Sequence, residues 1–395
     1  MKKFISILLA LVFSLSVATP IFAESGTKYA AEAQNSFYSD ANITFDYQVT
    51  GAYLCEAKTG KVLYATNEFK AASPASVTKI MTLLLVCEAL ESGKYKLDDT
   101  VRISANAASM GGSQVFLEEG ERITVEELIK ATVIASGNDA SVALAELTAG
   151  SESAFVKMMN KRAVELGLKN TNFENTTGLD DITTNHYSCA ADIATMSRAL
   201  IEHEIILKYS SIWQDTIRNG DFTLTNTNRL VRYYDGCNGL KTGSTDKAGY
   251  CISTTAKRGN MQLIAVILGA PTKDERNAAA RALLDYGFAN YAVFERTEEF
   301  VEQAKVLNGV KDTVDLYRSP AYILVEKSKL SSVEEVYEIP ENFSSPIKEG
   351  EAIGRITYFI DGNQIGFSEI CSKESIEKIT ISEIFIRILK RVICG

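Results

Sequence analysis

The sequence has few residues of the types that build metal centres and cross-linked scaffolds. Only two histidines are present, His186 and His203, and no Cys-x-x-Cys pair occurs among the seven cysteines. A zinc cluster therefore has no support. No Gly-x-Ser-x-Gly motif occurs either, so a conventional Ser-His-Asp hydrolase is disfavoured. With 6 prolines and 25 glycines in 395 residues, collagen-like and disordered classes are excluded, and the length suggests two or three domains.

The seven cysteines are scattered along the chain and odd in number, which is not the pattern of a disulfide framework. We expect most of them to be buried as small apolar side chains. One pair stays open, because Cys237 and Cys251 flank a Lys-Thr-Gly tripeptide and could meet across neighbouring strands. A disulfide between these two is the less favoured alternative.

The N-terminus has the features of a targeting segment. Residues 1–23 begin with Lys2 and Lys3, continue with an apolar run and end in small residues at Ala23. This is the layout of a signal peptide cleaved after Ala23, and the apolar run is short for the alternative, an uncleaved membrane anchor. The sequence thus predicts an exported protein. Without the two lysines, 39 basic residues face 50 acidic ones, and an acidic chain without a basic patch is a poor candidate for binding nucleic acid.

A polar leader at 24–42 precedes a first folded domain at 43–292. The stretch VTGAYLCEAKTGKVLYATN alternates around Lys58-Thr59-Gly60, which predicts a β-hairpin with this tripeptide in its turn. A second hairpin is predicted around Arg258-Gly259-Asn260, and Thr124 with Glu127 forms a capping box. Strands at both ends with helices between them predict an α/β (α+β) sandwich, an antiparallel sheet flanked by helices. The predicted helices cover about 76–90, 124–149 with an interruption, 152–166, 190–204 and 273–289.

The residue pattern changes in the rest of the chain. Residues 293–371 contain short β-rich runs between turn signals such as Asp361-Gly362, which predicts a separate small all-β domain. Residues 372–395 predict an amphipathic helix with a basic polar face. A helix packed on the domain and an interfacial membrane anchor are both compatible with this pattern. The terminal position and the basic face on an acidic protein favour the membrane surface.

Three short motifs bear chemistry, and each occurs more than once. Ser-x-x-Lys occurs four times, Ser-x-Asn twice and Lys-Thr-Gly twice. Only Ser76 and Lys79 open a buried apolar helix, where their spacing puts both side chains on one face. The helix N-terminus offers Ser76 backbone N–H groups for a developing oxyanion. Burial lowers the pKa of Lys79, so that its neutral amine can take the serine proton.

The other two motifs are candidates for the rest of a site. Ser136-Gly137-Asn138 interrupts two helices, where Ser136 can relay a proton to a leaving amine and Asn138 can hold Lys79 and a substrate carbonyl; a plain helix-breaking cap is the alternative. In the second Lys-Thr-Gly, Lys241 supplies positive charge for a carboxylate, Thr242 a hydrogen bond, and Gly243 room for a substrate backbone. The backbone N–H of Ser244 can join that of Ser76 as an oxyanion hole. The first copy, in a hairpin turn before Ser76, is a decoy.

This combination of motifs, in this order, resembles the penicillin-binding proteins, and most closely the D-alanyl-D-alanine carboxypeptidases of low molecular mass. The resemblance rests on PASVTKIMT, GGSQVFLEEGE, ASGNDASVALAE, NTTGLDD, HYSCAADIA and GLKTGSTDKAGYC. It implies a serine β-lactamase/DD-peptidase-like catalytic domain at 43–292, followed by the small β-rich domain and a membrane-anchoring helix. It also implies hydrolysis without a cofactor or a metal, and a location on the extracytoplasmic face of the membrane or in the wall.

The resemblance assigns roles to individual residues. Ser76 is the nucleophile that becomes acylated and Lys79 its base, while Ser136 and Asn138 complete proton transfer. Lys241 and Thr242 bind the terminal carboxylate of a peptidoglycan stem pentapeptide, and β-lactam antibiotics acylate the same serine. Arg276 falls where the family keeps an arginine for that carboxylate; an exposed arginine at a helix start is the alternative. His186 is expected to be structural.

Two other functions stay open. A serine β-lactamase shares the three-motif plan, but class A enzymes usually have Ser-Asp-Asn and a Glu-x-x-x-Asn element. The nearest stretch here, ELGLKN, places Asn170 five residues after Glu165. A silent penicillin-binding scaffold would be expected to lose one of the motif residues, and all of them are present.

Overall fold

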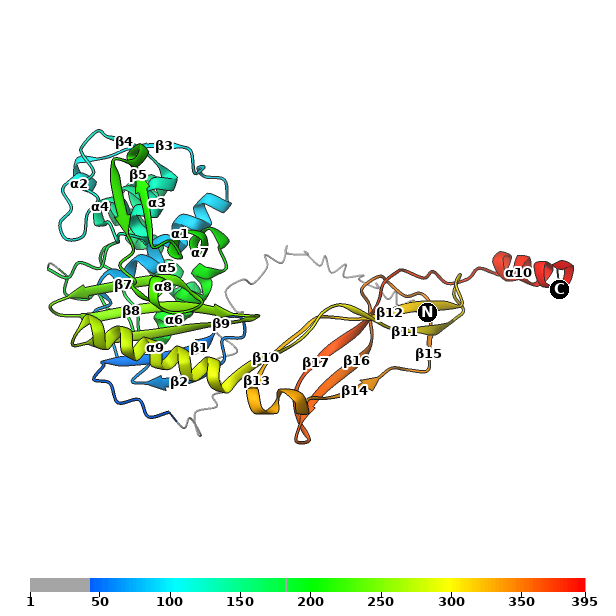
Figure 1. Cartoon of the computed structure of the whole chain (residues 1–395). Coiled ribbons are helices and arrows are strands. Elements are labelled where there is room, and N and C mark those ends of the chain that lie inside the picture. Colours follow the sequence, from blue (N-terminus) through cyan, green and yellow to red (C-terminus); the bar gives the residue numbers. More distant parts are fainter. Residues whose placement is uncertain (1–42, 182, 395) are drawn as a thin grey trace, which may run out of the picture.

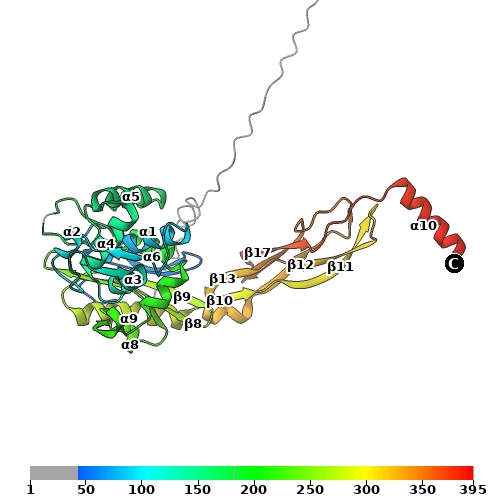
Figure 2. The same ribbon diagram turned by 90° about the horizontal axis from the view of Figure 1, so that it is seen from above.

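The computed structural model describes residues 43–181 and 183–394. The signal peptide predicted at 1–23 and the leader predicted at 24–42 lie outside the described residues. A globular domain is followed by an elongated β-rich domain, and the C-terminal helix lies at the far end of that second domain (Figures 1 and 2). The α/β fold with a small all-β domain predicted from the sequence is confirmed.

The core of the first domain is a five-stranded antiparallel sheet of order β2-β1-β9-β8-β7. The N-terminal hairpin thereby pairs with strands that follow about 200 residues later, β1 lying against β9. These strands are β1 (Gly51–Glu56), β2 (Val62–Thr66), β7 (Cys237–Thr245), β8 (Gly249–Arg258) and β9 (Met261–Ala270). Both predicted hairpins are confirmed.

Helices cover both faces of this sheet, because its central strands are apolar on both sides. Tyr53 and Cys55 belong to one hydrophobic core, and Ala52 and Leu54 to another, as the alternation of side chains along a strand requires. Helix α9 (Lys273–Asn290) covers one face, and the helices around the site lie on the opposite face (Figure 1). Those that carry or support the site are α1 (Lys79–Glu91), α3 (Val125–Val133), α4 (Asn138–Ala149), α5 (Glu152–Glu165) and α6 (Ala190–Ile201).

Short elements that the sequence patterns did not predict separately complete the first domain. The helix expected at 190–204 ends at Ile201, and a second helix begins at Glu204. The capping box of Thr124 and Glu127 is present at the start of α3. The short elements are β3 (Thr100–Arg102), α2 (Ala105–Ala108), β4 (Arg122–Thr124), α7 (Glu204–Ser210), β5 (Gln214–Ile217), β6 (Phe222–Thr225) and α8 (Leu230–Tyr233).

The second domain combines a β10-β13 ribbon with a six-stranded sheet of order β14-β16-β17-β12-β11-β15. The predicted turn at Asp361-Gly362 joins β16 to β17, with both residues at positive φ. Ile356, Tyr358 and Ile370 lie in its core. The strands are β10 (Tyr291–Arg296), β11 (Glu299–Leu307), β12 (Thr313–Arg318), β13 (Ala321–Glu326), β14 (Glu334–Glu338), β15 (Asn342–Ser344), β16 (Ala352–Ile360) and β17 (Asn363–Ser372).

The first Lys-Thr-Gly forms the β1–β2 turn, as predicted. The buried carboxylate of Glu56 accepts hydrogen bonds from the backbone N–H of Lys58 at 3.1 Å and of Thr59 at 2.7 Å. It also accepts one at 2.9 Å from the Tyr322 hydroxyl of the second domain. The Lys58 ammonium lies 4.1 Å from the centre of the Tyr322 ring. This turn therefore also joins the two domains.

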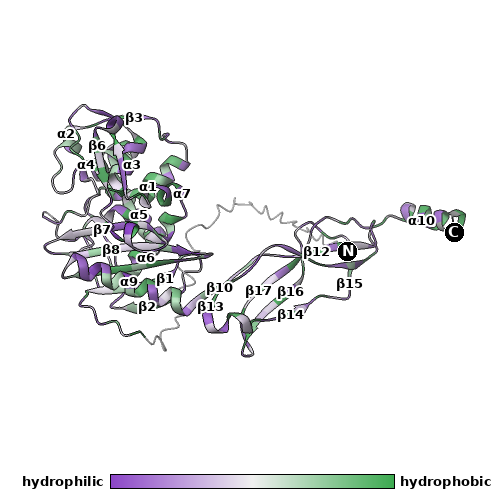
Figure 3. Cartoon of the chain, viewed as in Figure 1, coloured by the Kyte–Doolittle hydropathy of each residue, from purple (hydrophilic) through white to green (hydrophobic). Residues whose placement is uncertain are grey.

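The C-terminal helix α10 (Ile381–Cys394) begins nine residues later than the predicted segment 372–395. The preceding residues belong to the β-domain, since Ile376 is fully buried there and bridges to Ile347. Several apolar side chains of α10 are exposed, among them Ile381 and Phe385, and Figure 3 shows its two-sided hydropathy. Among the described residues, no helix combines the length and the apolar character needed to span a bilayer.

Six cysteines are free, and all of them except the half-buried Cys371 are buried; the six are Cys55, Cys87, Cys189, Cys237, Cys251 and Cys371. The possible disulfide between Cys237 and Cys251 is absent, because the register of the β7–β8 hairpin keeps these residues apart. Cys237 lies opposite Ala256, whereas Cys251 lies opposite Gly243. The expectation that most of the cysteines are buried is confirmed.

Candidate active site

Ser76 and Lys79 lie together at the start of the central helix. Ser76 is in a 3-10 turn (Ala75–Thr78) that precedes α1, and Lys79 is the first residue of α1. The α-helix thus begins three residues later than predicted. Ala75 has a positive φ of 47°, an uncommon conformation for a residue with a side chain. The Lys79 Nζ lies 3.0 Å from the Ser76 Oγ, which is hydrogen-bond distance.

Lys79 is completely buried and has three hydrogen-bond partners. Besides Ser76, its Nζ donates to the Asn138 Oδ1 at 2.5 Å and to the backbone carbonyl of Thr177 at 2.9 Å. Burial, followed by the nearby Lys241 ammonium, lowers the pKa of Lys79 well below its ordinary value. The two carbonyl oxygens can only accept, so they occupy both N–H groups of a neutral amine. In that neutral form, the nitrogen lone pair is left to accept from the Ser76 hydroxyl.

The Thr177 carbonyl is the functional group that the sequence reasoning missed. It sits in a turn held by Asn175, whose Oδ1 accepts from the backbone N–H of Gly178 at 2.7 Å and whose Nδ2 donates to the Leu179 carbonyl at 2.7 Å. Gly178 has φ +82°, and a Cβ there would lie 1.8 Å from the Ala75 carbonyl oxygen. Only glycine allows this turn to approach the Ser76 segment so closely.

Ser136 lies in the break between α3 and α4, as predicted, and Asn138 is the first residue of α4. Ser136 is buried at a positive φ of 63°, and its Oγ is one of the buried polar atoms without a hydrogen-bond partner among the described residues. Such a strained, unpaired polar group is typical of functional sites. The Asn138 Oδ1 holds Lys79 as expected. Its Nδ2 donates to the Gly111 carbonyl at 2.7 Å, so in this structure the group expected to bind a substrate carbonyl is occupied.

The second Lys-Thr-Gly lies on the edge strand β7, directly beside the Ser76 turn. A Cβ on Gly243 would lie 2.7 Å from the Ser76 backbone nitrogen and 2.9 Å from that of Val77. Gly243 is therefore required for this approach, and the next residue, Ser244, is exposed. The Thr242 Oγ1 donates to the Thr227 Oγ1 at 2.8 Å.

Lys241 and Arg276 add two buried cations to this edge. Burial lowers the pKa of Lys241 to about 7, with a further contribution from Arg276. Burial likewise lowers the pKa of Arg276 to about 10. The guanidinium donates to the Asn277 Oδ1, and neither cation is paired with a carboxylate among the residues that the structure describes. Buried charges are normally paired, so the edge is suited to an anionic ligand.

His186 has a structural setting. Its Nδ1 accepts from the backbone N–H of Glu174 at 3.0 Å, so its Nε2 carries the proton and donates to the Thr78 Oγ1 at 2.8 Å. Burial lowers the pKa of His186 to about 4. The ring therefore stays neutral near pH 7 and supports the turn that carries Ser76.

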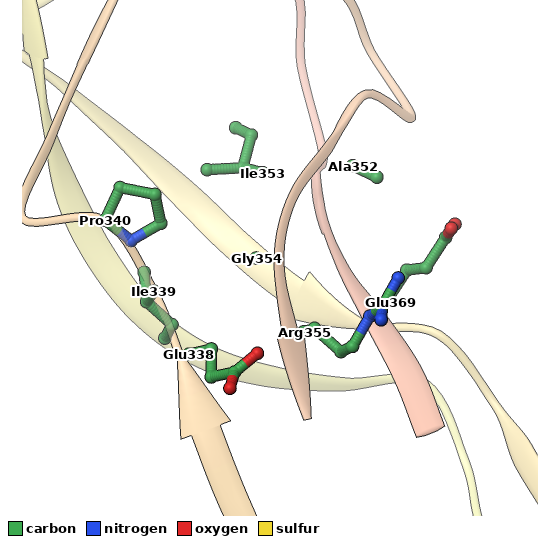
Figure 4. A pocket seen from close by; sticks show the side chains of 8 residues that line it. All are labelled: Glu338, Ile339, Pro340, Ala352, Ile353, Gly354, Arg355 and Glu369. Carbon is green, nitrogen blue, oxygen red and sulfur yellow. The ribbon is translucent and has the colours of Figure 1, made fainter. Parts of the chain in front are cut away.

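Other candidate regions lack such a constellation. Glu165 pairs with Lys161 and Arg162 at the end of α5, and the Asn170 backbone N–H donates to Asp192, so neither contacts Ser76 or Lys79 among the described contacts. An open hollow of about 520 Å³ in the β-domain includes Arg355 and two glutamates in its lining but no paired nucleophile and base (Figure 4). In the described part of the chain, no three His, Cys, Asp or Glu side chains are grouped to hold a metal ion.

Comparisons with known proteins agree with this geometry. A family model described as D-alanyl-D-alanine carboxypeptidase matches residues 38–272, and one described as the C-terminal domain of penicillin-binding protein 5 matches residues 288–378. The chain is 43% identical over 398 residues to the D-alanyl-D-alanine carboxypeptidase DacF of Bacillus subtilis, covering 99% of this chain and 98% of that protein. It is 34% identical to DacC of Escherichia coli, covering 82% of this chain and 83% of DacC.

Solved structures of penicillin-binding proteins are also similar to this chain. Penicillin-binding protein 5 from Haemophilus influenzae superposes with a TM-score of 0.71 at 33% identity, over 84% of this chain and 98% of that one. Penicillin-binding protein D2 from Listeria monocytogenes, in its ampicillin-bound form, superposes with a TM-score of 0.58 at 30% identity, over 62% of this chain and all of the other. The chain belongs to the D-alanyl-D-alanine carboxypeptidase family.

Proposed function

We propose that this chain is a serine-type D-alanyl-D-alanine carboxypeptidase that removes the terminal D-alanine of peptidoglycan stem pentapeptides through an acyl-enzyme on Ser76. The observation that carries the proposal is the hydrogen-bonded group of Ser76, Lys79 and Asn138 beside two unpaired buried cations. The first group supplies an activated nucleophile, and the second supplies a place for a free carboxylate. A chain-terminal peptide bond is the substrate that needs both.

In the acylation step, the Ser76 Oγ attacks the carbonyl carbon of the penultimate D-alanine while its proton passes to the neutral Lys79 Nζ. The backbone N–H groups of Ser76 and Ser244 stabilise the oxyanion. The Ser136 hydroxyl relays this proton from Lys79 to the leaving nitrogen, the C–N bond breaks and D-alanine departs, which leaves Lys79 neutral again. Water then attacks the carbonyl carbon of the Ser76 ester while Lys79 takes the water proton. The ester C–O bond breaks, the proton passes from Lys79 to the Ser76 Oγ, and the shortened peptide leaves as its carboxylate.

Recognition of the terminal carboxylate falls to Lys241, Thr242 and Arg276. The pairing of a carboxylate with desolvated cations is stronger than in water, and it favours peptides that end at this position. Asn138 reaches a substrate carbonyl only by exchanging its bond to Gly111. β-Lactams, whose strained amide and carboxylate imitate the same two features, are expected to acylate Ser76 and to deacylate slowly.

The test is release of D-alanine from a stem pentapeptide by the full chain, with Ser76→Ala beside it. We expect release by the wild type, loss of at least about a thousandfold in the variant, and block by penicillin. Rapid turnover of penicillin without release of D-alanine would indicate a β-lactamase. Neither release nor turnover, with stable labelling of Ser76, would indicate a binding scaffold.

The proposed place of action is the extracytoplasmic face of the membrane. The predicted signal peptide supports export, and the exposed apolar side of α10 supports an interfacial contact with lipid. The full chain should then sediment with anionic vesicles, and Phe385→Glu should weaken this binding without changing D-alanine release from a soluble peptide. Equal sedimentation of the two proteins would contradict the helix as the anchor.

A further inference from the structure

Asp180 connects three segments that surround Ser76. Its Oδ2 accepts a hydrogen bond from the Thr245 Oγ1 at 2.5 Å and another from the Ser73 Oγ at 3.2 Å. Asp180 itself follows the turn that presents the Thr177 carbonyl. Asp180 belongs to NTTGLDD, one of the stretches that carry the family resemblance. It lies outside the Ser-x-x-Lys, Ser-x-Asn and Lys-Thr-Gly motifs, and the mechanism above does not use it.

Each of the three segments carries part of the machinery. Ser73 is three residues before the nucleophile Ser76, and Thr245 directly follows Ser244. The Asp180 segment delivers the Thr177 carbonyl to Lys79. One carboxylate oxygen thus ties the nucleophile turn, the lysine-holding turn and the end of strand β7 together.

The bonding capacity of Thr245 makes this link specific. Its hydroxyl accepts from the backbone N–H of Ala248 at 3.0 Å, which closes the turn between β7 and β8. Its only proton is given to Asp180. A hydrogen bond to an ionised carboxylate is shorter and stronger than one between neutral groups, so Thr245 is held more firmly than by the turn alone.

We propose that Asp180 is a positioning residue that sets the gap between the backbone N–H groups of Ser76 and Ser244, and that this inference rests on the proposed function. An oxyanion hole requires its two donors at a defined separation. Asp180 holds Thr245 and Ser73, which lie close in sequence to the two donors. The residues of the carboxylate site, Lys241 and Arg276, make no hydrogen bond to Asp180. Loss of Asp180 should therefore lower kcat and leave KM for the pentapeptide nearly unchanged.

The test compares Asp180→Ala, Asp180→Asn and Thr245→Val in the full chain. Because one oxygen accepts both bonds, the amide oxygen of asparagine can replace it. We expect kcat to fall about tenfold or more in Asp180→Ala and in Thr245→Val, and to stay within about threefold of the wild type in Asp180→Asn. The double variant Asp180→Ala/Thr245→Val should lose no more than either single variant. Asp181→Ala, an exposed neighbour with no hydrogen bond or ion pair among the described residues, is the matched control.

Three results would overturn the proposal: unchanged kcat with a lowered melting temperature in Asp180→Ala, equal losses in Asp180→Asn and Asp180→Ala, or additive losses in the double variant. The rate of Ser76 acylation by penicillin provides a second readout that does not need the pentapeptide. If the wild type is acylated but releases no D-alanine, the proposed function fails. A tenfold slower acylation of Asp180→Ala would then still support the positioning role.

Discussion

The chain contains the same tripeptide twice, in two settings with opposite properties. Lys58-Thr59-Gly60 forms a hairpin turn, where the Lys58 ammonium lies over the Tyr322 ring and Thr59 binds Glu56. Lys241-Thr242-Gly243 lies on a strand, where Lys241 is buried and Gly243 abuts the backbone of Ser76. The side chains are identical, so the chemistry comes from burial and from what lies beside them. Substitutions in the two copies should therefore differ in their effects on catalysis.

The largest difference in activity is expected between alanine substitutions at the two glycines, Gly243 and Gly60. In Gly243→Ala, the new methyl group collides with the backbone nitrogen of Ser76, a rigid neighbour, so we expect kcat/KM for D-alanine release to fall by about a hundredfold or more. In Gly60→Ala, the positive φ costs about 1–2 kcal/mol of unfolding free energy, and the Arg198 guanidinium, 2.3 Å from the new Cβ, must also shift, but activity should stay unchanged. Steady-state kinetics and thermal unfolding of both variants separate these effects. Equal activity of the two variants would remove the basis for the contrast.

Substitutions of the two lysines, Lys241 and Lys58, should differ almost as much in their effect on kcat/KM. Lys241→Gln removes a buried cation from the carboxylate site, and we expect a loss of about a hundredfold in kcat/KM. Lys58→Gln removes a partly exposed cation–π contact, and activity should stay within about twofold. Both values come from D-alanine release at subsaturating pentapeptide. A strong effect at Lys58 would show that the first copy is not a decoy.

The pH dependence should be specific to the second copy. Because the pKa of Lys241 is lowered to about 7, its side chain is charged below that pH and becomes neutral above it. The kcat/KM of the free enzyme should therefore decline as the pH rises through about 7. Lys241→Arg keeps its charge and should lose this decline, whereas Lys58→Arg should keep it. An unchanged profile in Lys241→Arg would contradict the assignment.

The first copy should affect stability alone. Tyr322→Phe removes the hydroxyl that donates to the buried Glu56 carboxylate, and we expect a loss of about 1–2 kcal/mol in unfolding free energy. Cleavage of a short pentapeptide should not change, since this turn lies outside the Ser76 group. Denaturant unfolding followed in parallel with D-alanine release provides the measurement. Lower activity of Tyr322→Phe with unchanged stability would contradict this prediction, because it would show that the contact between Glu56 and Tyr322 contributes to catalysis.

Much of this architecture could be predicted because local patterns are strong. Alternation and turn residues predicted both hairpins, and the capping box at Thr124 formed as expected. The choice of Ser76 among four Ser-x-x-Lys motifs followed from the buried helix that it opens, and the structure places Lys79 beside it. These inferences needed only neighbours within a few positions along the chain.

Long-range contacts made by the backbone could not be predicted in the same way. The Thr177 group that contacts Lys79 is a backbone carbonyl, which every residue type has, so no side chain in the sequence identifies it. The hydrogen bond from the Asn138 side chain to the Gly111 carbonyl depends on the conformation of the loop that contains Gly111. No local sequence pattern predicts that conformation. The start of the α-helix at Lys79 instead of Ser76 reflects the 3-10 turn packed against Gly178, a residue 102 positions later.

The most direct test of the central claim is to identify the residue that becomes acylated. The full chain would be incubated with penicillin, digested, and mapped by mass spectrometry, with Lys79→Ala beside it. We expect a single penicilloyl ester on Ser76 in the wild type and an acylation rate at least about a hundredfold lower in the variant. Labelling of another serine, or equal rates in the two proteins, would contradict this expectation.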